Sequence, residues 1–444
     1  MKIINKYIIL IIGCILVISA SNIQWWKDSK GREDNWVIIE TDGKGYYAYL
    51  PAIFIYHDLQ YSYFETIEEK YYATLRQDFR SSVNGRKVNK YYAGTAVAMA
   101  PFFLVAHGLT LATGNVPDGF SKYYNIVINI AGIFYLLAGL YFLRKMLRLY
   151  GISETTITII VVAFTFGTSL YYYAVIEPAM SHIYSFAFVT AFLFYTKDWF
   201  LNRKPVNIVY MGILLGMIVL IRPVNGIVIA SIPFIAGEYS ILKSGILDLF
   251  NYFKWLIVSA LVCLLICFIQ LLLYKLQVGS FIVYSYTNEG FLWTDPQFFN
   301  ILFSYKKGLF VYTPLLLLSF TGLFFLYKIS KFSFYVFLLN FIFVTYILSA
   351  WWCWYYGGSF GMRAFIEFYA LFAILLALSL KYIQNKVQRS LFIGAIFILT
   401  LVCQVQTYQY RYYYIHWSEM TKEHYWEVFM RVDWLIDGSN KPKF

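Results

Sequence analysis

Long apolar segments, separated by short polar connections, fill most of the chain. Each of them approaches the roughly 20 residues that a helix needs to cross a bilayer. The pattern predicts an all-α polytopic membrane protein of about eleven transmembrane helices, with a long first outer loop that contains interfacial helices. The expected spans are residues 7–23, 123–143, 155–174, 182–197, 206–221, 224–238, 255–274, 309–327, 332–350, 364–380 and 390–408.

Segment 91–114 decides the orientation of everything after it. It is apolar enough to span, but it contains Pro101, His107 and three glycines. If it does not span, all the main basic clusters lie on the side of the chain's first residues, as Lys and Arg of short cytoplasmic loops do. We therefore expect 91–114 to form a helix or helix pair in the outer interface. The basic clusters are residues 144–148, 197–204, 328–331 and 381–389.

The orientation in which 91–114 does not span places most of the unusual polar residues on the outer side. The first span follows Lys2 and Lys6, so the long loop 24–122 is expected outside. We expect one transmembrane domain, residues 1–410, that includes this loop, and a short outer tail, residues 411–444. Removal of the first span as a signal peptide stays open.

Composition and charge narrow the function. Hydrophobic residues make up 60% of the chain and charged residues only 14%. The net charge of +12 comes from clusters between apolar segments, which is typical of orientation signals, so we expect membrane lipids and no nucleic acid as partners. The five cysteines and five histidines are dispersed, so no disulfide framework and no metal site is assigned. No phosphate loop, dinucleotide fingerprint or nucleophile elbow occurs, and the chemistry is expected at the outer leaflet.

The stretch ETDGKGYYAYLPAIFIYHDL, residues 40–59, follows the first span. Asp42 lies between Thr41 and Gly43, where the backbone can turn sharply and present a carboxylate at the membrane surface. Such a carboxylate can act as a general base. Tyr46 and Tyr47 begin a stretch that suits a short interfacial helix. The structural alternative is an Asx turn that leads into an anchoring helix.

The general plan of the chain resembles the GT-C superfamily of integral-membrane glycosyltransferases, which holds protein mannosyltransferases, aminoarabinose transferases of lipid A and oligosaccharyltransferases. In that group an essential acidic residue follows the first span, then come half-embedded helices and a span that ends in a basic cluster. Asp42, segment 91–114 and residues 123–148 fall in that order. The resemblance also rests on NKYYAGTAVAMAPFFLVAHGL (89–109), SYKKGLFVYTPLLLL (304–318) and GGSFGMRAFIEFYALFAI (357–374).

The resemblance implies transfer of a sugar from a polyprenyl-phosphate carrier, with Asp42 as catalytic base and outer cations on the donor phosphate. The cations expected there are Lys90, Arg222 and Arg363, with Lys306 and Lys307 as further outer cations. Arginine is the better bidentate partner of phosphate. In related enzymes prolines often follow the basic residue before the interfacial helix, whereas tyrosines follow Lys90 here. No cofactor is assigned, although some relatives use a divalent cation, which stays open for Asp42.

Further residues are expected to contact the acceptor or the sugar: Tyr46, Tyr47, Glu177, His182 and Trp352. Each has a structural alternative, because interfacial aromatic belts and hydrogen-bonded histidines are common. For Arg363 the alternative to phosphate binding is a salt bridge with Glu367, one helical turn later.

The sequence therefore predicts a hexosyl- or pentosyltransferase of the inner (plasma) membrane, with its site facing the periplasm or cell exterior. The acceptor could be a protein, lipid A or a glycan. The rival functions are a lipid or glycan transporter, which would favour charges along mid-membrane helix faces, and a non-catalytic membrane scaffold, for which Asp42 would be dispensable.

Overall fold

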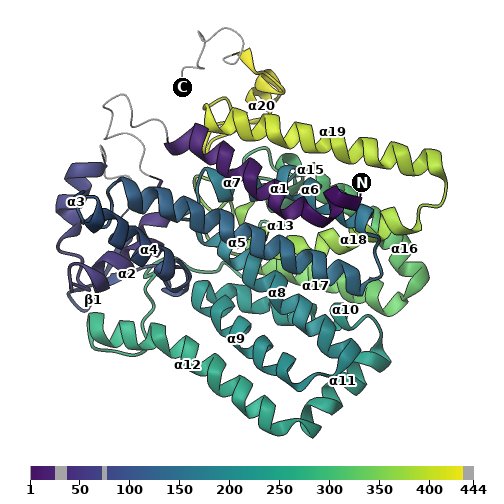
Figure 1. The fold of residues 1–444 in the computed structure, drawn as a ribbon, viewed down its shortest axis with the longest axis horizontal. Helices are drawn as coiled ribbons and strands as arrows, with labels where there is room; N and C mark the ends of the chain where they lie inside the picture. Colours follow the sequence, from purple (N-terminus) through teal and green to yellow (C-terminus); the bar gives the residue numbers. More distant parts are fainter. Residues whose placement is uncertain (1, 26–37, 73–77, 434–444) are drawn as a thin grey trace.

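The computed structural model describes residues 2–25, 38–72 and 78–433, and these are almost entirely helical (Figure 1). Parts of the expected outer loop (26–37, 73–77) and the end of the expected tail (434–444) lie outside the described residues. The elements up to residue 149 are α1 (Lys2–Ala20), η1 (Ser21–Trp25), α2 (Asp42–Phe54), α3 (Phe64–Tyr71), β1 (Arg80–Val83), β2 (Arg86–Asn89), α4 (Gly94–Ala112) and α5 (Lys122–Leu149).

The rest of the chain continues as helices. They are α6 (Glu154–Phe166), α7 (Leu170–Val175), α8 (Ser181–Asn202), α9 (Pro205–Ile221), η3 (Pro223–Ser231), α10 (Ile232–Ala236), α11 (Tyr239–Asn251), α12 (Phe253–Val278), α13 (Phe298–Phe303), α14 (Leu309–Tyr312), α15 (Pro314–Ser319), α16 (Thr321–Ile329), α17 (Lys331–Ser349), η4 (Arg363–Phe368), α18 (Tyr369–Tyr382), α19 (Lys386–Arg411) and α20 (Lys422–Val428).

Seven helices of the described residues are long and apolar enough to cross a membrane, and the expected all-α polytopic class is confirmed. Four shorter apolar helices accompany them. Every expected span corresponds to one of these helices except 182–197, which lies in α8. The long candidates are Ile3–Ile23, Gly94–Ala112, Lys122–Leu149, Phe253–Val278, Lys331–Ser349, Arg363–Tyr382 and Lys386–Arg411, and the shorter ones Glu154–Phe166, Pro205–Ile221, Pro223–Ala236 and Pro314–Ile329.

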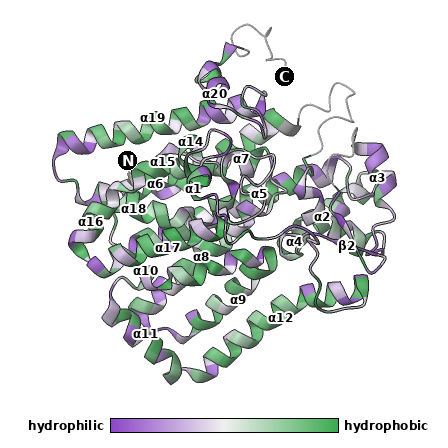
Figure 2. Ribbon diagram, turned by 180° about the vertical axis from the view of Figure 1, so that it is seen from behind, coloured by the Kyte–Doolittle hydropathy of each residue, from purple (hydrophilic) through white to green (hydrophobic). Residues whose placement is uncertain are grey.

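Side-chain contacts bring the four basic clusters together at one end of the bundle, which we call the basic end (144–148, 197–204, 328–331 and 381–389). Apolar residues line the helices between this end and the other, and hydrophilic residues gather at helix ends and on α3 and α20 (Figure 2). The contacts are Arg144 Nη2 to Asn5 O (2.7 Å), Lys381 Nζ to Tyr150 O (2.8 Å), Arg389 Nη2 to Thr156 Oγ1 (3.2 Å), Lys197 Nζ to Ile235 O (3.0 Å) and Ser330 Oγ to Gly237 O (2.8 Å).

Helix α4 runs beside the first half of α5. The Tyr135 hydroxyl donates to Ala98 O (2.9 Å), and His107 Nδ1 lies 2.6 Å from the Tyr124 hydroxyl, so the two helices are antiparallel. Helix α1 begins at the basic end, and α5 ends there. The residues that connect the end of α1 to the start of α5 therefore make no net crossing of the bundle. This favours the frame in which 91–114 is not a single span, although its length and hydropathy would suffice for one.

The segments α2, α3, α4 and the hairpin β1–β2 form a lobe at one end of the bundle, which we call the outer lobe after the orientation expected from the sequence (Figure 1). The hairpin pairs Val83 with Arg86, and Asn84 and Gly85 between them have φ values of 52° and 75°. Positive φ at both central residues is what a tight two-residue hairpin turn requires.

Helix α18 lies at the centre of the bundle, with every residue from 361 to 380 buried. Helix α16 packs closely on it, because a Cβ at Gly322 would lie 2.2 Å from Leu375 O. Irregular helices flank this centre: the expected span 309–327 is divided at Pro314, whose ring nitrogen cannot donate. The buried segment 361–380, in which η4 carries Arg363 and Glu367 directly before α18, is the part of the bundle that positions the site.

Gly322→Ala should destabilise the protein, because the added methyl must displace backbone of α18. We expect a loss of about 1–3 kcal/mol in unfolding free energy, measured by thermal unfolding in detergent. Gly394→Ala in α19 is the matched control, since a Cβ there meets nothing within 4 Å and alanine favours helix. Equal melting temperatures for the two variants would contradict the packing of α16 on α18.

Cysteine labelling tests which end faces outward. In a variant without the five native cysteines, Arg86→Cys in the outer lobe should react with an impermeant thiol reagent in intact cells. Gln384→Cys at the basic end should react only after permeabilisation, because basic short loops stay in the cytoplasm. Both positions are exposed. The reverse labelling would overturn the expected orientation.

Candidate functional site

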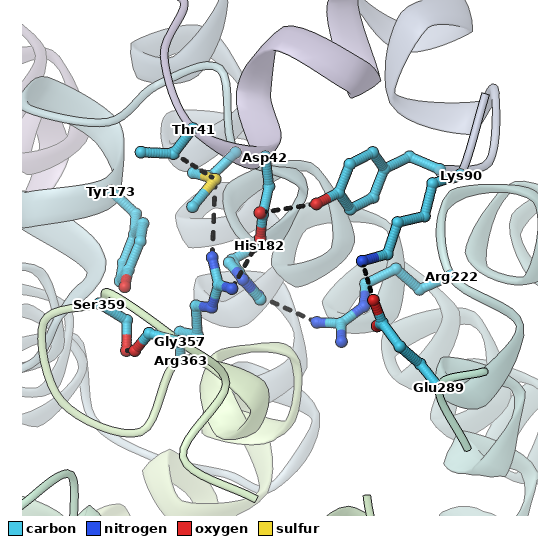
Figure 3. A network of polar contacts seen from close by, with 12 residues as sticks. Thr41, Asp42, Lys90, Tyr173, His182, Arg222, Glu289, Gly357, Ser359 and Arg363 are labelled. Carbon is cyan, nitrogen blue, oxygen red and sulfur yellow. Dashed lines mark hydrogen bonds and ion pairs between the residues drawn. The ribbon is translucent and has the colours of Figure 1, made fainter. Parts of the chain in front are cut away.

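Opposite the basic end, seven segments far apart in the sequence bring polar side chains together, and Figure 3 shows part of this arrangement. They are the start of α2, the link from β2 to α4, the α7–α8 link with the start of α8, the residue after α9, the α12–α13 connection, the α13–α14 connection and η4. We call these side chains the polar cluster: Asp42, Lys90, Tyr91, Glu177, His182, Arg222, Glu289, Lys307, Arg363 and Glu367.

Asp42 and Arg363 form the central ion pair of the cluster. Arg363 Nη2 donates to Asp42 Oδ2 (2.6 Å), and the Tyr91 hydroxyl donates to Oδ1 (2.7 Å). Asp42 is only 9% exposed. Burial raises the pKa of this carboxyl, but Arg363 and Tyr91 outweigh burial and hold the pKa below its ordinary value. Asp42 is therefore a carboxylate at neutral pH.

The backbone at Asp42 is a helix start rather than the Asx turn considered from sequence. Thr41, the residue before it, has a φ of 50° and a ψ of −133°, which is costly for a side chain branched at Cβ. The strained residue turns the chain into α2, and Asp42 reaches across to Arg363 instead of capping its own helix.

Arg363 is not neutralised by Glu367, so that sequence alternative is wrong. The two residues lie in η4, a 3-10 helix of three residues per turn, in which positions four apart point about 120° away from each other. Arg363 instead pairs with Asp42 across 321 positions of sequence. Its Nη1 contacts the sulfur of Met180 (3.8 Å), and its Nε is buried without a hydrogen-bond partner among the described residues.

Glu367 is the anchor of a second ion pair. It is fully buried, and its Oε1 lies 3.0 Å from His182 Nδ1, 3.3 Å from Arg222 Nη1 and 3.5 Å from Asn225 Nδ2. The helical path breaks between Arg222 and Pro223, because α9 ends at Ile221 and η3 begins at the proline. The break releases the Arg222 side chain toward His182 and Glu367.

Lys90 has a partner that the sequence did not indicate. Its ammonium contacts the carboxylate of Glu289, from the connection between α12 and α13, and Figure 3 shows this pair beside Arg222. Both side chains are partly exposed, 21% for Lys90 and 26% for Glu289. The pair is thus more accessible than the two arginine pairs.

Glu177 and Lys307 form the part of the cluster that titrates near neutrality. Glu177 Oε1 accepts from the Tyr172 hydroxyl (2.9 Å), whereas its Oε2 is buried with no partner among the described residues. Burial raises the pKa of Glu177 to about 7 and lowers that of Lys307 to about 7. Lys307 donates to Ser359 O. Lys306 instead reaches Glu419 at the surface (3.3 Å).

Three aromatic residues expected at the site occupy different places. The Tyr46 ring packs on the Tyr91 ring with centroids 4.6 Å apart, next to Asp42. The Tyr47 hydroxyl donates to Gly119 O (2.5 Å) in the outer lobe, since the next residue of a helix turns about 100° away. Trp352 is 49% exposed, and within the described residues no hydrogen bond or ring contact links its side chain to the polar cluster.

No three His, Cys, Asp or Glu side chains of the described residues gather in a way that could hold a metal ion. Both oxygens of Asp42 are engaged, by Arg363 and Tyr91. The residues in this arrangement do not fit a divalent cation at Asp42, and no chemical step is assigned to one.

No family model matches the chain, and no curated protein matches it. The solved structures that are similar include two of an oligosaccharyltransferase. One is the archaeal oligosaccharyltransferase AglB from Archaeoglobus fulgidus in complex with an inhibitory peptide and a dolichol-phosphate (10% identity, TM-score 0.47, 96% of this chain and 58% of that chain). The other is the Archaeoglobus fulgidus oligosaccharyltransferase in the apo form (11%, 0.48, 99% and 59%). The chain thus spans less than two thirds of their length, and no residue role is transferred from them.

Double variants should identify the partner of Arg363. Arg363→Met strands buried Asp42 and should cost about 3–5 kcal/mol of unfolding free energy. Adding Asp42→Asn should recover a large part of that loss, because both charges are then gone. Adding Glu367→Gln should recover none, since Glu367 serves Arg222 and His182. Thermal unfolding in detergent measures all three, and rescue by Glu367→Gln alone would contradict the observed pairing.

Proposed function

We propose that the chain is a GT-C-type membrane glycosyltransferase that moves a sugar from a polyprenyl-phosphate carrier to an acceptor hydroxyl at the outer face of the plasma membrane. One observation carries the proposal: a buried, ionised carboxylate, Asp42, is joined to an arginine that still has N–H groups to offer. A carboxylate base and a phosphate-binding cation are the two groups that this transfer requires.

Arg363 links the two parts of the reaction. Its Nη2 holds Asp42, while among the described residues Nε lacks a partner and Nη1 contacts the Met180 sulfur. The remaining N–H groups of the guanidinium can donate to phosphate oxygens without releasing Asp42. As the arginine's charge is shared with phosphate, its hold on Asp42 weakens, so the pKa of Asp42 rises and the carboxylate becomes a better base.

In the proposed step the acceptor oxygen attacks the anomeric carbon of the sugar and gives its proton to Asp42. The bond between that carbon and the phosphate oxygen breaks, and the electron pair leaves with the phosphate. Arg363 and Arg222 stabilise the charge that develops there. Direct displacement of this kind inverts the configuration at the anomeric carbon.

Other sequence assignments stay proposals with unequal support. Tyr46, Glu177 and His182 lie in or beside the polar cluster, where they can contact sugar or acceptor. Lys90 can steer the phosphate only by leaving Glu289, and the contact of Tyr47 with Gly119 favours a structural role. Experiment decides whether the donor is a hexosyl or a pentosyl sugar and whether the acceptor is a protein, lipid A or a glycan. The outward orientation of the site is tested by the cysteine labelling described above.

Incubation of purified protein with labelled polyprenyl-phosphate sugars and a membrane extract should yield a covalently labelled acceptor. Asp42→Asn should lower the transfer rate at least about 100-fold, since a general base contributes roughly 10²–10⁴. Rates are compared on protein that elutes as a single folded species. Label that crosses a vesicle membrane without becoming attached to an acceptor would favour the transporter.

Glu65→Gln is the matched control, because Glu65 is an exposed carboxylate of the same outer lobe. It should transfer at the wild-type rate. Transfer by Asp42→Asn within tenfold of Glu65→Gln would remove Asp42 as the base. An absence of covalent label with every donor tried would contradict the enzyme itself.

A further inference from the structure

At the basic end, away from Asp42, residues at the end of α5, near the end of α8 and at the start of α9 line an open cavity of about 460 Å³. Helix α8 packs between α5 and α9, as both ribbon views show (Figures 1 and 2). A volume of this size falls within the range of small-molecule sites, roughly 300–1,000 Å³. None of the residues assigned to the polar cluster lines this cavity.

The cavity carries an excess of positive charge. Lys145 and Arg148 of α5 and Lys204 of the α8–α9 connection line it, together with one carboxylate, Asp198. Arg148 is paired with Glu154. For Lys145 and Lys204 no ion pair with a carboxylate of the described residues occurs.

Asp198 forms no ion pair with either lysine among the described residues. Instead its oxygens accept from two amides: Asn202 Nδ2 donates to Oδ1 (2.5 Å), and Asn207 Nδ2 donates to Oδ2 (2.7 Å). Asn207 is buried, so this arrangement is held by the packing of α9 on α8. The carboxylate keeps its charge, but the three cations of the lining outnumber it, so an excess of positive charge remains.

The remaining wall is apolar. Leu149, Phe194 and Val206 line the cavity, and the Lys145 ammonium stands 4.4 Å from the centroid of the Phe194 ring. The apolar surface continues outward, because Val206 and Tyr210 of α9 are each 40% exposed. A free inorganic anion would use the cations but not this wall.

We propose that this cavity binds an anionic phospholipid of the leaflet at the basic end. The headgroup phosphate lies between Lys145 and Lys204, and the first carbons of an acyl chain lie against Val206 and Leu149. Basic cavities between the ends of membrane helices on the cytoplasmic side are suited to anionic headgroups. The inference is independent of the proposed glycosyl transfer.

The full chain, purified and delipidated, is titrated with phosphatidylglycerol or with phosphatidylcholine, and bound lipid is counted by native mass spectrometry. We expect one tightly retained phosphatidylglycerol and none of the zwitterionic lipid at the same concentration. Lys145→Gln with Lys204→Gln should weaken phosphatidylglycerol binding about tenfold or more. Val206→Trp should also weaken it, because the indole fills the apolar part without changing charge.

Lys328→Gln with Lys331→Gln is the matched control, since these exposed lysines lie at the same end outside the cavity. It should bind phosphatidylglycerol as the wild type does. Equal weakening in the control would mean a general surface effect and overturn the site. Competition by millimolar inorganic phosphate as strong as that by added phosphatidylglycerol would overturn the lipid as occupant. The melting temperature in neutral detergent verifies that each variant is folded.

Discussion

The buried ion pair between Asp42 and Arg363 is the interaction on which the site depends. It joins the outer lobe to the central helix of the bundle across 321 positions of sequence. Each charge needs the other at this depth, because removing one partner leaves an uncompensated charge away from water and destabilises the fold. The same contact therefore fixes the position of the lobe, holds Asp42 as a carboxylate and aims the arginine.

Irregular backbone makes this pairing geometrically available. A regular α-helix through Arg363 would direct Glu367 to the same face and let the two neutralise each other. The 3-10 turn of η4 separates them, so each residue finds a partner from another segment. The break at Pro223 and the strained Thr41 act likewise, because each turns a charged side chain out of its own helix. Such local cost is typical of functional sites.

The sequence predicted the features that depend on local apolar pattern and on the distribution of basic residues along the chain. The apolar segments predicted most of the spans, and the basic clusters predicted one common end. It did not predict the partner of Arg363 or the Glu289 contact of Lys90, because contacts between segments so far apart leave no periodic signal. Tyr47 was grouped with Tyr46 as neighbours in sequence, yet helical rotation turns their side chains apart. Glu367 was weighed only as a local partner, and its contacts with His182 and Arg222 come from tertiary packing.

Charge balance distinguishes the two ends of the bundle. In the polar cluster three cations are matched by three carboxylates: Arg363 by Asp42, Arg222 by Glu367 and Lys90 by Glu289. A phosphate that enters a neutral cluster adds negative charge to a buried place, which is costly unless a nearby group changes its protonation. Lys307 and Glu177 can supply that change, because both have a pKa of about 7 and can take up a proton at little cost. At the basic end, by contrast, Lys145 and Lys204 have no carboxylate partner among the described residues, so an anion that binds there meets an excess of positive charge rather than a balanced cluster.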